Sequence, residues 1–78
     1  MDSKDIYNLH LNSALQHIKL AKQQEASDKH EVAYKHYLEA SSKLMDLLRI
    51  EENEDRKKVF VKHLNETIAN AGFLKTLI

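Results

Sequence analysis

The sequence predicts an all-α protein, folded as an antiparallel bundle of three helices. The chain has 78 residues, no proline and a single glycine, Gly72, so little in it breaks a helix. Apolar residues recur at steps of three and four along three long stretches, which is the spacing of one helix face. Short polar clusters separate the stretches, and short connections favour antiparallel neighbours. We expect residues 1–78 to form one domain, the N-terminal module of a larger protein.

The first helix is expected from about Ser3 or Asp5, either of which can cap the free amides of its first turn, to about Ser27. Leu9 and Leu20 fall opposite its apolar stripe, either as scattered surface leucines or as a second contact surface. The stripe spans roughly a third of the helix circumference. It consists of Tyr7, Leu11, Ala14, Leu15, Ile18 and Ala21, with Glu25 next in line.

The second helix is expected from about Lys29 to Glu51, with Ser27 or Asp28 as its cap. Small residues in its central stripe let a neighbouring helix come close. Leu38 and Met45 lie about 80–100° to one side of that stripe, so the apolar face is wide enough for two neighbours, or for one neighbour and a ligand. The central stripe consists of Ala33, Tyr37, Ala40, Leu44 and Leu48.

The third helix is expected from about Glu54 to nearly Ile78. The acidic cluster at residues 51–55 suits a helix start, although it could also be an acidic docking patch. Val61 and Ile68 lie on one flank of the apolar stripe, and Gly72 lies just beyond. A glycine inside a helix costs about 1 kcal/mol relative to alanine, so either the helix frays there or something packs closely against it. The stripe consists of Phe60, Leu64, Thr67, Ala71, Leu74 and Ile78.

The charge balance and composition argue against several classes of partner. Lys and Arg together number 12, as do Asp and Glu, so the formal net charge is zero. This disfavours nucleic acid as a partner and also charge-driven binding to anionic lipid. No apolar run approaches the roughly 20 residues of a membrane span, so we expect no direct membrane insertion. Cysteine is absent, which excludes disulfides and is compatible with a cytoplasmic location.

No group of residues in the sequence indicates catalysis. Ser41 and Ser42 have no positioned base, and the chain lacks a glycine-rich phosphate loop. His10 and His17 are two helical turns, roughly 10 Å, apart, which is too far to share one zinc ion. We therefore expect no metal and no cofactor, and half-buried or solvated histidines. The sequence predicts a binding module and not an enzyme.

The flanks of the second and third helices are the candidate binding surface. If they face each other, they line a shallow apolar groove, in which amphipathic helices commonly dock. Methionine suits such an adaptable surface. The same residues could instead simply widen the core. The candidate groove residues are Leu38, Met45, Val61, Ile68 and Gly72.

These patterns make the chain similar to the microtubule-interacting and trafficking (MIT) domain, over about residues 11 to 78. The resemblance rests on an alanine followed by an acid before a small turn, on an Ala-x3-Tyr-x2-Ala helix, and on the pattern of residues 67–74. In this sequence the matching positions are Ala21, Glu25, Asp28, Ala33, Tyr37 and Ala40. Four positions depart from the family. Asp28 replaces a common glycine and His30 a common aromatic, and Ala69 and Gly72 are uncharged where many members carry acids.

The resemblance implies a monomeric three-helix domain that binds C-terminal peptides of ESCRT-III-type subunits and is held at endosomal membranes through those partners. A helical motif would lie between the second and third helices, with Ile68 at the position of the groove leucine and Met45 opposite. An extended motif would lie between the first and third helices, at Ile18, Leu64 and Thr67. The alternative function is a bundle for self-association or regulation, with no ESCRT-III ligand.

Overall fold

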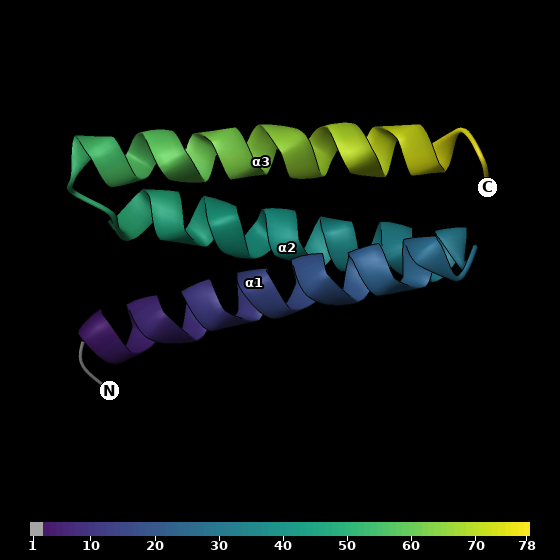
Figure 1. The fold of residues 1–78 in the computed structure, drawn as a ribbon. Coiled ribbons are helices and arrows are strands. Elements are labelled where there is room, and N and C mark those ends of the chain that lie inside the picture. Colours follow the sequence, from purple (N-terminus) through teal and green to yellow (C-terminus); the bar gives the residue numbers. More distant parts are fainter. Residues whose placement is uncertain (1–2) are drawn as a thin grey trace.

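The computed structural model describes residues 3–78, which form three α-helices and no strand: α1 (Ser3–Ala26), α2 (His30–Ile50) and α3 (Glu54–Lys75). Figure 1 shows α2 between α1 and α3, with consecutive helices running in opposite directions. The predicted all-α three-helix fold is confirmed. The largest difference from the predicted bounds is at the end of α3, which stops at Lys75 and leaves Ile78 59% exposed outside the helix instead of in its apolar stripe.

The turn after α1 explains why its caps differ from the prediction. Asp28 has φ 58°, in the left-handed region. The Asp28 N–H donates to the Glu25 carbonyl (3.0 Å) and the Lys29 N–H to that of Gln24 (2.9 Å), which is the Schellman arrangement of a helix C-terminus. Asp28 therefore closes α1 and does not cap α2. The N-cap of α2 is Lys29, which makes no side-chain cap hydrogen bond, so the prediction of Ser27 or Asp28 is wrong.

The start of α3 has a side-chain cap, and the start of α1 lies at the edge of the described residues. At α3, the Asn53 side chain accepts from the Arg56 N–H at 3.0 Å, and acidic residues occupy the first turn, as the helix dipole favours. At α1, Asp5 lies inside the first turn. The side chain of Ser3, the other predicted cap, lies outside the described residues.

The core consists of two buried clusters to which all three helices contribute. One contains Ala21, Ala33, Tyr37, Ala71 and Leu74. The other contains Ala14, Leu44, Leu47 and Phe60, with Tyr7, Leu11, Leu48 and Leu64 packed against it. The four alanines of the α1–α2 contact are fully buried, which lets the two backbones come close: Ala14, Ala21, Ala33 and Ala40.

Two leucines exchange the roles that the periodicity predicts. Leu15, predicted in the α1 stripe, is 55% exposed, whereas Leu47, which lies outside the predicted α2 stripe, is fully buried. Leu15 lies one residue beyond the fully buried Ala14 and thus about 100° around the helix. The buried side of α1 is therefore centred on Ala14, and Leu15 lies beyond its edge.

Gly72 lies within α3, which continues unbroken to Lys75. A Cβ atom built there would meet nothing within 4 Å, so the helix neither frays at Gly72 nor has a neighbour packed closely against it. Both expected explanations are therefore wrong.

Replacing Gly72 with alanine should stabilise the domain by about 0.5–1 kcal/mol, because alanine restricts the unfolded chain and fits the helix without a clash. Urea unfolding followed by circular dichroism measures the effect. Ala69→Gly, at an exposed position one turn earlier, is the matched control and should destabilise by a similar amount. A lower midpoint for Gly72→Ala would show that the glycine is required in the fold.

Candidate functional site

The candidate α2/α3 groove, defined by Leu38, Met45, Val61, Ile68 and Gly72, contains two rows of exposed apolar side chains, one on each helix. The exposed fractions are 46% for Leu38, 43% for Met45, 42% for Val61 and 53% for Ile68. In each row the two residues are seven positions apart, close to two helical turns, so they lie on one side of their helix. None of them belongs to a buried cluster. These side chains therefore do not widen the core.

A hollow of about 470 Å³ lies between α2 and the end of α3, beside Leu38. Leu38 lines this hollow from α2, and Lys75 lines it from α3. Lys75 follows Ile68 by seven residues, so it continues the row of Val61 and Ile68. The remaining lining residues are Glu31, Tyr34, Lys35 and Ile78.

The residues predicted for a groove between α1 and α3 are less accessible. Ile18 and Leu64 are half-buried, and Thr67 is 3% exposed. The Thr67 hydroxyl donates to the His63 carbonyl at 2.7 Å, which satisfies it within its own helix. These three side chains offer a ligand little surface.

A different set of apolar residues borders α1 and α3. Asn70 hydrogen bonds with Tyr37, which also bonds Glu25 of α1, so this flank of α3 faces α1. Val59 and Leu77 lie eleven residues before and seven after Asn70, close to whole turns, and are 50% and 49% exposed. Their position on the far side of the α3 stripe was the sequence signal for this surface.

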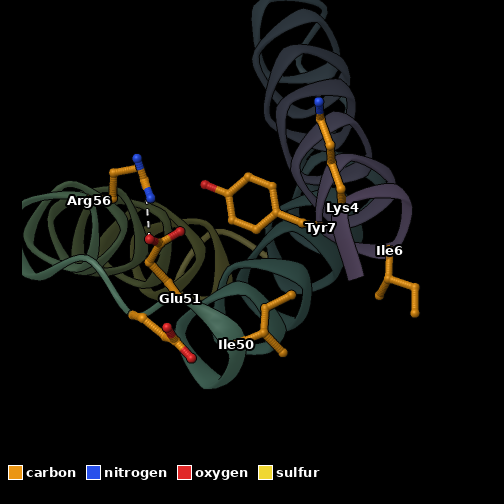
Figure 2. A pocket seen from close by; sticks show the side chains of 7 residues that line it. Lys4, Ile6, Tyr7, Ile50, Glu51 and Arg56 are labelled. Carbon is orange, nitrogen blue, oxygen red and sulfur yellow. Dashed lines mark hydrogen bonds and ion pairs between the residues drawn. The ribbon is translucent and has the colours of Figure 1, made fainter. Parts of the chain in front are cut away.

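A second hollow, of about 690 Å³, lies where α1 begins and α2 meets α3. Figure 2 shows the Tyr7 ring pointing toward Glu51 and Arg56, which are joined by a hydrogen bond. Glu51, the first residue of the acidic cluster at residues 51–55, is only 6% exposed. Its carboxylate accepts from the Arg56 Nε (2.8 Å) and the Asn53 N–H (3.0 Å), so it holds together the connection between α2 and α3. The lining residues are Lys4, Ile6, Tyr7, Ile50, Glu51, Glu52 and Arg56.

The surroundings of Glu51 favour its charged form. Burial acts to raise the pKa of the Glu51 carboxyl, but the hydrogen bonds from Asn53, Arg56 and Tyr7 outweigh burial and lower it. Burial and the neighbouring carboxylate raise the pKa of the Tyr7 hydroxyl. Both shifts keep Glu51 as a charged acceptor and Tyr7 as a neutral donor.

Glu51→Gln should lower the melting temperature at pH 7 by on the order of 5 °C, because the amide is a weaker acceptor for Arg56. The folded-state pKa of Glu51 lies below the ordinary value of 4.5. The stabilisation by the carboxylate is therefore complete above about pH 4.5 and is lost as the pH falls through the folded-state pKa. Melts at pH 7 and pH 3 should show the difference between wild type and variant shrinking in acid. Glu52→Gln, at an exposed neighbour, should change little; an equal effect there would contradict this role for Glu51.

The structure also brings together two histidines that sequence spacing alone did not connect. His17 of α1 and His36 of α2 approach to 2.9 Å between their Nδ1 atoms. The Nδ1 atom of His10 lies 4.0 Å from the Oδ2 atom of Asp46. Within residues 3–78, no group of three or more His, Cys, Asp or Glu side chains is arranged to hold a metal ion. None of the three described helices is both long and apolar enough to span a membrane.

The chain matches the model of a known domain family. The family model of the MIT (microtubule interacting and transport) domain matches residues 11–76, which include α2 and α3 entirely and α1 from Leu11 onward. Among curated proteins and solved structures, none matches the chain significantly.

Proposed function

Because this chain belongs to the MIT domain family, whose members are helical and generally non-catalytic protein-interaction modules, we propose that it binds a short amphipathic helix of a partner protein in the α2/α3 groove. The observation that supports this most directly is the pair of exposed apolar rows, Leu38 with Met45 and Val61 with Ile68. Exposed apolar side chains that recur in rows are typical of a surface that a partner protein covers.

The spacing of the rows suits a helical ligand. Residues seven positions apart are roughly 10 Å apart along a helix, which matches anchors at i, i+3, i+4 and i+7 of a docked helix. Each fully buried anchor contributes about 1.5–3 kcal/mol, part of which is offset by the lost freedom of the peptide. The expected affinity is therefore modest, with a Kd on the order of micromolar or weaker.

The proposed partners are C-terminal motifs of ESCRT-III-type subunits, and binding would recruit the rest of the protein to endosomal or other membranes that these subunits remodel. The middle of the groove is uncharged on α3, where Ala69 and Gly72 are exposed. Charged groups gather at its end, around Lys75. The contact would therefore depend mainly on apolar burial, with charge acting only at the end of the groove.

Titration of the ¹⁵N-labelled 78-residue chain with C-terminal peptides of ESCRT-III-type subunits tests the proposal. Amide shifts should concentrate at Leu38, Met45, Val61 and Ile68. Shifts concentrated at Val59 and Leu77 instead would move the site to the α1/α3 side. The absence of shifts with any peptide, together with a concentration-dependent sedimentation coefficient, would favour self-association over peptide binding.

A further inference from the structure

His17 and His36 meet beside the alanine-lined contact between α1 and α2, and both are half-buried. Their ring centroids are 5.2 Å apart and their planes are inclined by 34°. With an Nδ1–Nδ1 distance of 2.9 Å, this centroid separation requires the two nitrogens to lie nearly on the line between the ring centres. The nitrogens therefore point at each other.

This geometry suits a shared proton and not a metal ion. A hydrogen bond of 2.9 Å needs an N–H on one Nδ1 and a lone pair on the other. A zinc ion lies about 2.0–2.1 Å from each histidine nitrogen, so an ion on the line between the rings would need a wider gap. The contact joins the two helices through one proton.

We propose that the His17–His36 pair is a proton-sensitive link between α1 and α2, which holds while at least one Nδ1 is unprotonated and opens when both rings are cationic. A first added proton can bind at Nε2 of the donor ring and leave the N–H···N bond intact, now charge-assisted. A second added proton must bind at the acceptor Nδ1. It then places two N–H groups and two positive charges face to face, which removes the bond.

The surroundings of the pair offer little to neutralise that second charge. On α1, His10 lies two turns before His17. The Asp46 carboxylate faces His10 and therefore does not face the pair. α3 shares a hollow with the Leu38 side of α2, and Leu38 lies about 200° around that helix from His36. On α2, Glu39 is the only carboxylate within a turn of His36. Lys29 and Lys43, two turns to either side of His36, add positive charge.

The consequence is a loss of stability in mild acid. In the unfolded chain the two imidazoles are independent and take up protons near pH 6.5. The folded pair resists its second proton, so below about pH 6.5 the unfolded state binds more protons, and folding weakens as the pH falls.

Urea unfolding of the 78-residue chain between pH 7.5 and pH 5 tests the link. Wild type should lose midpoint stability below about pH 6.5. The double variant His17→Gln/His36→Gln, which keeps hydrogen-bonding side chains that do not titrate, should lose much less. His10→Gln is the matched control, since it removes an imidazole outside the pair, and the acid-induced loss should persist in it. An equal loss in wild type and in the double variant would overturn the proposal.

A second measurement does not depend on how stable the variants are. In NMR titrations of the wild-type chain, the ring protons of His17 and His36 should shift together in two steps. In the His36→Gln variant, His17 should titrate in a single step. Independent single-step titration of both rings in wild type would contradict a shared proton.

Discussion

Ile68→Asp is expected to weaken binding of a helical peptide ligand by about 100-fold or more. Burying a large aliphatic side chain contributes about 1.5–3 kcal/mol, and each 1.4 kcal/mol corresponds to a tenfold change in Kd. The aspartate removes this contribution and also places a carboxylate against the apolar face of the ligand, where it has no partner. Fluorescence anisotropy of a labelled peptide measures the change.

The fold should survive this substitution, because Ile68 is 53% exposed and belongs to neither buried cluster. Far-ultraviolet circular dichroism should therefore be unchanged. Leu9→Asp is the matched control, since Leu9 is 58% exposed on the far side of α1, and it should leave binding intact. Val59→Asp distinguishes the two surfaces: loss of binding there, with Ile68→Asp unaffected, would place the ligand between α1 and α3.

Much of the fold could be predicted because a helix reveals its buried face through spacing alone. The steps of three and four identify Ala33, Tyr37, Ala40 and Leu44 as one face, and all four are buried. The scarcity of helix breakers predicts long helices with short connections. What spacing does not give is the rotation of each helix about its own axis. A rotation that brings the alanines of α1 and α2 into contact buries Leu47 and exposes Leu15.

For the candidate groove, spacing predicts which side chains are exposed. The flank positions of Leu38 and Ile68 follow from their angle to the stripe, and both are exposed in the structure. Whether two flanks face each other depends on how the helices pack, which one helix at a time does not reveal. The same limit hid the His17–His36 contact, whose partners are 19 residues apart and on different helices.

Glu51 and Asp28 show a second limit, which concerns the connections. A run of acids reads as solvated, yet Glu51 is buried because Asn53 and Arg56 follow it at the distances that let them donate to its carboxylate. Asp28 reads as an N-cap but occupies the left-handed position of the preceding helix end. Polar residues at helix ends can serve either neighbour, and backbone geometry decides which.

Tyr37→Ala should have the largest effect on stability, a loss of about 3–5 kcal/mol. Tyr37 is 1% exposed and lies in a cluster formed by α1, α2 and α3, so the truncated side chain leaves a cavity that all three helices border. A domain of this length is stabilised by only about 4–12 kcal/mol in total. The variant should therefore be partly unfolded near 37 °C, which thermal melts followed by circular dichroism would show.

Tyr37→Phe separates the ring from the hydroxyl. The hydroxyl donates to Glu25 at 2.6 Å, so its removal should cost only about 1–2 kcal/mol, mostly from leaving that carboxylate without its donor. Burial, followed by the contact with Glu25, raises the pKa of Tyr37 above its ordinary value of 10.0. The unfolded chain thus loses this proton first, and wild type should lose stability above about pH 10 more steeply than Tyr37→Phe. If phenylalanine destabilised as much as alanine, the hydrogen bond to Glu25, and not ring packing, would hold the three helices together at this point.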